Sequence, residues 1–313
     1  MQPTVSINLC CYNSEKYLRE TIDSVIKQTC KDWELVIIND GSKDSTEAIV
    51  HDYIQRGHPI RYIYQENHGL GYSRNKALEH SSGEFIAFLD HDDLWVPEKL
   101  AKQVSVMRNN QDVDFVYSNY YKLTTYTGKR LALGFKDKQP EGMIFFKFLY
   151  SYQVGLSSVM ISRRSLNSLD SLFDERFQHI EEFDVFMRVL YKHKASYIDE
   201  PLSVWRIHKN MGTMRSPERG PKEIQFLLEK FNHMDPLFAK KYPKDVEYIE
   251  VQLIKYSVAK YDILNGRSLA ARSSIAPHKW YSIRLFLAYL SSFFPQVLIK
   301  MMNESILFMK RIH

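Results

Sequence analysis

Cysteine is scarce in this chain, and its placement excludes a disulfide framework. The 313 residues contain three cysteines, Cys10, Cys11 and Cys30. An odd set, with two adjacent members inside an apolar segment, is typical of buried thiols in a reducing compartment. We therefore expect a cytoplasmic location.

Long apolar runs are also missing. No stretch reaches the roughly 18 apolar residues that a membrane-spanning helix needs. The N-terminus runs directly into the first predicted strand, without the charged and apolar regions of a leader. We expect neither a transmembrane helix nor a signal peptide.

Acidic residues are almost absent from the end of the chain. Residues 266–313 contain seven Lys and Arg residues but only one acidic residue, Glu304. This segment therefore accounts for the whole net charge of +5. The remainder is close to neutral, which argues against a nucleic-acid partner. Two interpretations of the basic, amphipathic segment 280–313 stay open. In the first, the segment binds peripherally to an anionic membrane, at the inner face of the cell membrane. In the second, it packs within a helical subdomain or against another subunit.

Apolar strands alternate with amphipathic helices through the first part of the chain. This order is typical of an α/β fold with a doubly wound, mostly parallel sheet flanked by helices. A hydrophobic content of 44% is enough for a sizeable core. The strands are predicted at 5–11, 33–39, 60–65, 85–89 and 114–122.

The domain organisation follows from where this pattern changes. Beyond residue 120 it loosens into loops and short strands, with a helix at 143–150, a helix at 179–192 and a strand at 195–198. Proline and glycine near residue 217 mark a boundary, and everything after it has helical periodicity. We predict a catalytic domain at 1–216, with halves 1–120 and 121–216, and a C-terminal helical extension at 217–313.

Three carboxylates follow the predicted strand 85–89, at Asp90, Asp92 and Asp93. Ligands of open α/β sheets bind at this edge. Carboxylates crowded there indicate a divalent cation, Mn²⁺ or Mg²⁺, held together with a phosphate-bearing ligand. The alternative is a solvated turn that caps the next helix, with Pro97 at its first position.

Other candidate residues lie at similar strand ends. Asp40 follows strand 33–39 and could accept a hydrogen bond from a base, or form an ordinary Asx turn. Arg74 and Asn75 begin a helix after Gly69 and Gly71, which allow close approach of a ligand.

Two segments in the second half carry further candidates. Glu181, Glu182 and Asp184 begin a helix, where one of them could serve as a general base or all could favour the helix dipole. Arg206 could bind a diphosphate, and His208 could bind metal or phosphate.

Taken in order, these segments resemble the family 2 glycosyltransferases with the GT-A fold. The resemblance runs from Val5 to about His208. The motifs that carry it are Cys11-Tyr12-Asn13, Asn39-Asp40-Gly41-Ser42, Asn67-His68-Gly69 with Arg74-Asn75, Asp90-His91-Asp92-Asp93, Phe173-Asp174-Glu175 and Trp205-Arg206-Ile207-His208.

The resemblance implies a role for each candidate. The nucleotide-sugar donor would bind Tyr12, Asn13, Asp40, Arg74, Asn75, Asp90 and Asp92. The metal ion would bind Asp92, Asp93 and His208, with Asp93 as its main ligand. Catalysis would use Arg206 beside the diphosphate and Glu182 as the base, with Asp184 as the second candidate. Glu182 departs from the family pattern, in which the base is an aspartate.

The implied activity is an inverting, metal-dependent transfer of a sugar. The donor would be a nucleoside-diphosphate sugar, with a UDP-sugar expected, and the acceptor a glycan or lipid-linked hydroxyl in surface polysaccharide synthesis, such as capsule or O-antigen. The alternative is a non-catalytic or nucleotidyltransferase-like relative that binds a sugar nucleotide. Against a nucleotidyltransferase, the first strand is followed by Cys11-Tyr12-Asn13-Ser14 and not by a glycine-rich phosphate loop.

Overall fold

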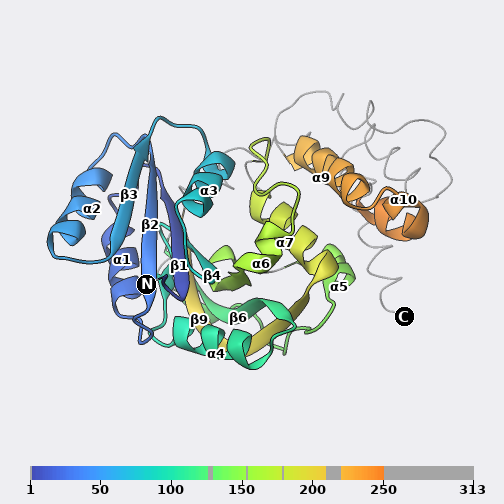
Figure 1. Cartoon of the computed structure of the whole chain (residues 1–313), viewed down its shortest axis with the longest axis horizontal. Coiled ribbons are helices and arrows are strands. Elements are labelled where there is room, and N and C mark those ends of the chain that lie inside the picture. Colours follow the sequence, from blue (N-terminus) through green and yellow to red (C-terminus); the bar gives the residue numbers. More distant parts are fainter. Residues whose placement is uncertain (1, 126–129, 153, 178–179, 209–219, 250–313) are drawn as a thin grey trace. The chain divides into compact units, whose positions relative to one another are not determined.

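The computed structural model describes most of the chain (Figure 1). The described residues are 2–125, 130–152, 154–177, 180–208 and 220–249. The chain divides into two compact units, Met1–Met211 (unit 1) and Gly212–His313 (unit 2). The boundary predicted between residues 216 and 217 lies outside the described residues and stays a prediction.

The first part of unit 1 alternates strands and helices as expected. Its strands are buried because apolar residues run almost without interruption through them, which suits a sheet covered on both faces. The elements are β1 (Val5–Cys11), α1 (Leu18–Ile26), β2 (Trp33–Asp40), α2 (Thr46–Gln55), β3 (Ile60–Gln65), α3 (Leu70–Glu79) and β4 (Phe85–Asp90).

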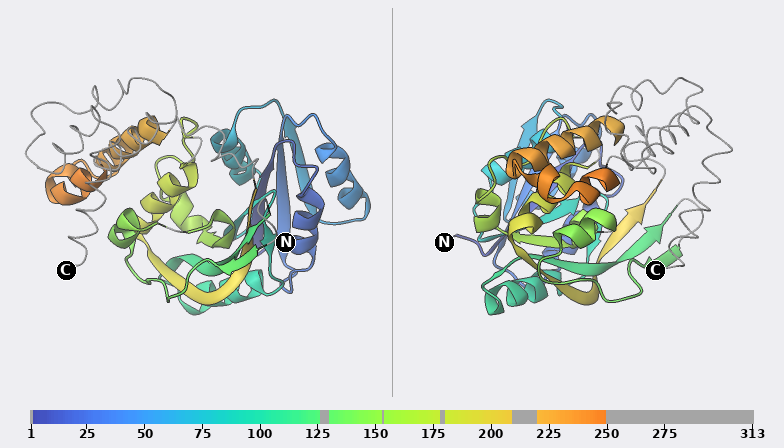
Figure 2. Two further views of the ribbon diagram at one scale, coloured as in Figure 1. Left: turned by 180° about the vertical axis from the view of Figure 1, so that it is seen from behind. Right: turned by 90° about the vertical axis from the view of Figure 1, so that its right-hand side faces the viewer.

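The second part of unit 1 extends the same sheet. Its elements are β5 (Leu94–Trp95), α4 (Lys99–Asn109), β6 (Val113–Thr124), β7 (Arg130–Leu133), α5 (Phe145–Tyr150), a 3₁₀ turn (Leu156–Ser158), β8 (Val159–Ser162), α6 (Arg163–Asn167), α7 (Glu181–Lys192) and β9 (Lys194–Ile207). Figure 2 shows how β6 and β9 curve alongside each other.

The sheet has nine strands in the order β3-β2-β1-β4-β8-β6-β9-β5, with β7 beside β6. Strands β1 to β4 are parallel, as are β6 and β9, whereas β8 runs antiparallel to both of its neighbours. The predicted doubly wound, mostly parallel sheet is therefore confirmed. Strand β8 lies in the segment for which short strands were predicted without bounds, and β9 is much longer than the predicted strand 195–198.

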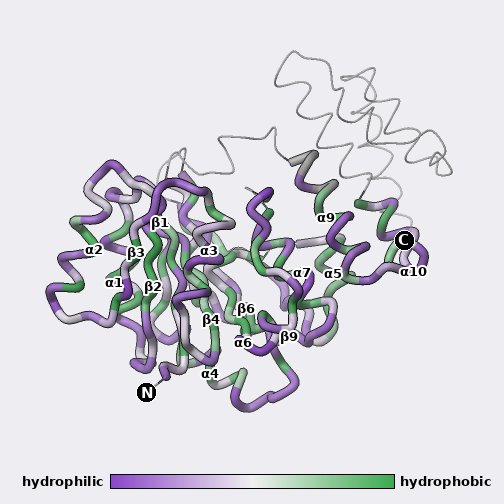
Figure 3. The backbone as a smooth tube through the Cα atoms, turned by 45° about the horizontal axis from the view of Figure 1, so that its top comes forward, coloured by the Kyte–Doolittle hydropathy of each residue, from purple (hydrophilic) through white to green (hydrophobic). Residues whose placement is uncertain are grey.

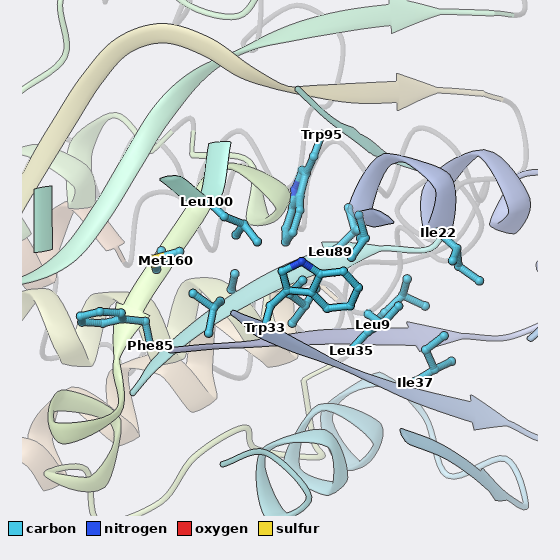
Figure 4. Close-up of a cluster of buried hydrophobic side chains, with 14 of the residues drawn as sticks. Leu9, Ile22, Trp33, Leu35, Ile37, Phe85, Leu89, Trp95, Leu100 and Met160 are labelled. Atoms are coloured by element: carbon cyan, nitrogen blue, oxygen red, sulfur yellow. The ribbon is translucent and has the colours of Figure 1, made fainter. Parts of the chain in front are cut away.

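Helices pack on both faces of this sheet, because alternate residues of a strand point to opposite sides. Leu35 and Ile37 of β2 belong to a cluster with residues of α1, α2 and α4. Val36 and Ile38 pack on the other face with Ala77 of α3. Figure 3 shows the hydrophobic segments gathered in the central strands. Figure 4 shows the larger cluster, in which Trp33, Trp95 and Phe85 contribute the bulky rings.

Unit 2 is helical where it is described. It contains α9 (Gly220–Met234) and α10 (Phe238–Lys241), in agreement with the helical periodicity of the sequence. Segment 280–313 lies outside the described residues. Among the helices that the structure does describe, none combines the length and the apolarity needed to cross a membrane.

Candidate active site

The candidate site begins where β1, β2 and β4 end at one edge of the sheet. The pairing of Cys11 with Asn39 and of Cys10 with Asp90 brings the three strand ends side by side. The turns that follow these strands therefore meet, which places the segments after Cys11, Asp40 and Asp90 together. This is the edge at which open α/β sheets bind ligands.

Asp40 organises the loop that follows β3. Its carboxylate accepts hydrogen bonds from the backbone N–H groups of His68 and Gly69, each at 2.9 Å, and from Gln65 Nε2 at 2.7 Å. Asp40 is also buried. The sequence predicted that this carboxylate contacts a nucleotide base. The carboxylate oxygens would then have to accept that hydrogen bond in addition to those from the protein.

Tyr12 and Asn13 lie on the turn after β1. Tyr12 is 46% exposed, a high value for an aromatic side chain at a strand end. Asn13 adopts φ 49° and links two turns, since its N–H donates to Ser42 Oγ and its Oδ1 accepts from the N–H of Lys43. Tyr12 thus offers an open ring face, whereas Asn13 braces the neighbouring backbone.

Arg74 lies at the centre of an acidic cluster. Its Nη1 lies 2.5 Å from Glu181 Oε1 and 3.7 Å from Glu182 Oε2, and its Nη2 lies 3.3 Å from Asp90 Oδ1. Burial alone would lower the pKa of Arg74, but the three surrounding carboxylates raise it above its ordinary value. A permanently charged guanidinium therefore joins the turn after β4 to the first turn of α7.

Asn75 does not point into this cluster. Its side-chain amide exchanges two hydrogen bonds with the backbone of Phe173, at 2.7 and 2.9 Å. Gly71 supports the same contact, because a Cβ there would lie 3.1 Å from the carbonyl oxygen of Asp174. The structure thus gives Asn75 a role in holding segment 173–175, in place of the donor contact expected from the sequence.

Glu182 is the best-placed candidate base. Its side chain remains 23% exposed, whereas Glu181 is almost fully buried. Desolvation, followed by the negative charge of Glu181, raises the pKa of Glu182 from 4.5 to about 8, although Arg74 opposes this shift. A carboxylate with a pKa near neutrality is suited to take a proton from a hydroxyl group.

Asp184 has a different environment. It is fully buried, and both of its oxygens bind Arg188, at 3.0 Å to Nε and 2.7 Å to Nη2. Arg188 in turn donates to the carbonyl oxygens of Ser171 and Leu172. Asp184 therefore stabilises the loop before α7, and the structure does not favour it as the second candidate base.

Asp93 is turned inward. Its Oδ1 accepts the backbone N–H of Arg206 at 2.9 Å and its Oδ2 accepts Ser157 Oγ at 2.6 Å. Burial raises the pKa of Asp93 well above its ordinary value, and the charges of Asp92 and Asp90 raise it further. The expectation that Asp93 is the main metal ligand does not suit this position, because both oxygens are already engaged.

Asp92 and His208 form the pair that remains for a metal ion. His208 Nε2 lies 2.8 Å from Asp92 Oδ2. Across the described ranges, no group of three or more His, Cys, Asp or Glu side chains could by itself hold a metal. Mg²⁺ sites in nucleotide enzymes commonly use one or two carboxylates and complete their shell with substrate phosphates and water. The pair therefore fits an ion that binds together with a diphosphate.

Arg206 is buried beside this pair. Its Nη2 bonds Glu20 Oε2 at 2.7 Å, and its guanidinium lies 4.4 Å from the ring centroid of Tyr17. Arg206 Nη1 is buried and has no hydrogen-bond partner among the residues that the structure describes. A buried, unpaired guanidinium N–H group is costly, so this atom indicates a position where an anion could complete the site.

Sequence reasoning missed two residues that organise this site. Ser157 joins Asp93 to the end of β4, since its Oγ also accepts the N–H of Asp90. Tyr17, the residue before α1, contacts both Arg206 and His208. No local pattern could reveal either role, because the partners lie far away in the sequence.

Comparison with known proteins agrees with this architecture. Residues 6–169, more than half of the chain, match the model of the family described as Glycosyl transferase family 2. An uncharacterized glycosyltransferase of Rickettsia typhi is 30% identical over 263 residues, which are 83% of this chain and 77% of that protein. The Escherichia coli protein WfgD, named UDP-Glc:alpha-D-GlcNAc-diphosphoundecaprenol beta-1,3-glucosyltransferase, is 33% identical over 198 residues, 62% of this chain and 73% of its own.

Solved structures show the same fold at lower identity. TarS of Staphylococcus aureus, solved with UDP-GlcNAc, has a TM-score of 0.63 at 19% identity and matches 92% of this chain and 81% of its own. The mannosyltransferase PcManGT of Pyrobaculum calidifontis, solved with GDP-Man and Mn²⁺, has a TM-score of 0.56 at 16% identity, over 94% and 88% of the two chains. The chain therefore belongs to the family 2 glycosyltransferases and has their GT-A fold.

Proposed function

We propose that this glycosyltransferase moves a sugar from a UDP-sugar to a hydroxyl group of a glycan or lipid-linked acceptor, with inversion at the anomeric carbon. The name of WfgD combines a UDP-sugar with a lipid-linked acceptor, and TarS has been solved with UDP-GlcNAc. Both support this class of substrates. By the same analogy we place the reaction in surface polysaccharide synthesis, such as capsule or O-antigen, at the cytoplasmic face of the membrane.

One observation carries the proposal. Arg74 contacts Asp90, at the end of the strand that leads to the acidic turn, and also Glu181 and Glu182 at the start of α7. The turn Asp90–Asp93, where the donor would bind, and the candidate base Glu182 are thereby joined through a single side chain. A sugar held at this turn would lie next to the base that activates the acceptor.

The chemistry follows from the placement of these groups. Glu182, as a carboxylate, would take the proton of the acceptor hydroxyl as its oxygen attacks the anomeric carbon from the face opposite the diphosphate. The bond between that carbon and the diphosphate oxygen breaks, and the electron pair leaves with the diphosphate. Arg206 would stabilise the resulting negative charge, since its Nη1 lacks a partner among the described residues.

Asp92 and His208 would hold a Mn²⁺ or Mg²⁺ ion, which would supply positive charge to the same diphosphate. PcManGT has been solved with Mn²⁺ and GDP-Man, which supports the use of a divalent ion. Tyr12 would stack against the base, because its ring is exposed at the adjoining strand end.

A nucleotide-release assay tests the proposal. Wild type, Glu182→Gln and His208→Ala would be incubated with UDP-, GDP- and dTDP-sugars and Mn²⁺, with candidate acceptors added separately. We expect release from one donor that rises with acceptor, and a loss of about 10²–10⁴-fold in Glu182→Gln.

Arg19→Ala is a suitable control, since Arg19 forms an exposed ion pair with Asp52 outside the site. Nucleotide binding without turnover on any donor and acceptor would favour the non-catalytic alternative. The anomeric configuration of the product, determined by NMR, tests inversion separately.

A further inference from the structure

We propose that Tyr17 is a positioning residue that holds two functional side chains, Arg206 and His208, in their orientations for the donor diphosphate and the metal ion. This inference rests on the proposed function for the roles of Arg206 and His208. The role of Tyr17 itself follows from contacts within unit 1.

A single aromatic ring contacts both side chains. The guanidinium carbon of Arg206 lies 4.4 Å from the ring centroid of Tyr17. The imidazole of His208 lies 5.0 Å from the same centroid, at an interplanar angle of 40°. Residues two apart along an extended chain share one side, so Arg206 and His208 both face α1.

Arg206 depends on this ring for more than packing. Its side chain is only 3% exposed, and within the described ranges its one salt bridge is with Glu20, whose side chain is 66% exposed. A desolvated guanidinium on an aromatic face gains favourable cation–π energy from the ring. Nη1 of the same guanidinium is buried and has no hydrogen-bond partner among the described residues, so it is available to an anion.

His208 is held from two directions. Its Nε2 contacts Asp92, while its ring lies against Tyr17. A metal ligand binds well only when its ring is already oriented, and groups behind the ligand commonly provide that orientation. Tyr17 supplies an aromatic surface in that position.

The backbone under these side chains is fixed independently of Tyr17. The N–H of Arg206 bonds Asp93, which is held in turn by Ser157. The ring contacts of Tyr17 described above are with the side chains of Arg206 and His208. Removing the ring should loosen Arg206 and His208 while β9 stays in place.

The proposal is tested with Tyr17→Leu and Tyr17→Phe in the full chain. We expect Tyr17→Leu to weaken UDP binding in EDTA, measured by calorimetry, and Mn²⁺ binding in the presence of saturating UDP, measured by electron paramagnetic resonance, each by roughly 5–20-fold. Tyr17→Phe keeps the ring and should restore both affinities to within about twofold of wild type.

Two further variants show whether Tyr17 acts through its partners. In an Arg206→Ala background, Tyr17→Leu should cause no additional loss of UDP affinity. In a His208→Ala background it should cause no additional loss of Mn²⁺ affinity. Full additivity in both backgrounds would overturn the proposal.

A ligand-free measurement separates this proposal from the proposed function. Hydrogen exchange of the Arg206 Nε–H, followed by NMR, should be about tenfold faster in Tyr17→Leu. Tyr53→Leu is the matched control. Tyr53 lies on α2, and its ring centroid is 5.4 Å from the guanidinium carbon of another arginine, Arg56. Unchanged Arg206 exchange in Tyr17→Leu would overturn the role of Tyr17, whereas a wild type that binds neither UDP nor Mn²⁺ would overturn the proposed function.

Discussion

Arg74 and Glu181 form a nearly buried ion pair, with 2.5 Å between Nη1 and Oε1 and side-chain exposures of 5% and 2%. One carboxylate oxygen of Glu181, Oε2, is buried without a hydrogen-bond partner in the described part of the chain. The pair is therefore held mainly by the Arg74 charge. Because the same guanidinium contacts Asp90 and Glu182, its loss affects both sides of the site.

Replacing Arg74 by methionine should destabilise the protein strongly. The change leaves the buried carboxylate of Glu181 without its cation, for which we expect a loss of about 3–5 kcal/mol in the free energy of unfolding. Urea unfolding followed by circular dichroism at pH 7 measures it. The double variant Arg74→Met/Glu181→Gln should recover part of the loss, and Arg19→Met, which breaks an exposed pair, should leave the midpoint unchanged.

The transfer rate should depend on the ionisation of Glu182. Its carboxylate is the active form, and its pKa is about 8, so kcat/KM should rise with pH and level off above that value. Glu182→Gln should remove this rise together with most of the rate. A profile of Glu182→Gln that keeps the same rise would assign the titration to another group.

Glu182 should also make stability depend on pH. Its pKa is higher in the folded chain, about 8, than the ordinary value of 4.5, so the folded state binds more protons between these values. The contribution of this group to stability is therefore complete below about pH 4.5 and is lost as the pH rises through about 8. We expect Glu182→Gln to melt at a higher temperature than wild type at pH 9 and at nearly the same temperature at pH 5. Equal melting temperatures at both pH values would contradict the raised pKa.

Asp92 and Asp93 should respond differently to the same substitution. Asp92→Asn should weaken Mn²⁺ binding and leave the melting temperature nearly unchanged, because Asp92 lies beside His208 in the proposed metal site. Asp93→Asn should cost about 1–3 kcal/mol of stability, since an amide cannot accept hydrogen bonds at both positions. Calorimetry and Mn²⁺ titration of both variants distinguish the two roles, and an Asp93→Asn variant with normal stability would restore Asp93 as a ligand candidate.

The turn after Asp40 should tolerate no side chain at Gly41. Gly41 has φ +78°, and an added Cβ would lie 2.9 Å from the backbone nitrogen of Asn67. Gly57 has a similar φ of +82° but has nothing within 4 Å of the Cβ position. Gly41→Ala should therefore lower the melting temperature more than Gly57→Ala, and the difference measures the steric clash apart from the backbone strain. Equal effects would show that the loop after β3 moves aside.

The local pattern of the sequence predicted most elements of the first half. Strands β1 to β4 were found because uninterrupted apolar runs mark strands that are buried on both faces. The bounds and the place of strand β8 were not predicted, because Val159–Ser162 is short and its antiparallel place between β4 and β6 depends on pairing with distant residues. Strand β9 was predicted too short because Glu200 and Pro201 interrupt its apolar pattern, although it pairs with β6 on both sides of them.

The sequence by itself determined the fold class, the family and which residues are chemically suited to the site, because strand periodicity and motif order are local properties of the chain. Only the tertiary structure decided how those residues are used. Asp92 and Asp93 are adjacent and have the same carboxylate, yet one faces His208 and the other is buried against Ser157 and Arg206. Which neighbour meets which partner depends on contacts between residues that are 64 to 116 positions apart, and such contacts exist only after the chain has folded.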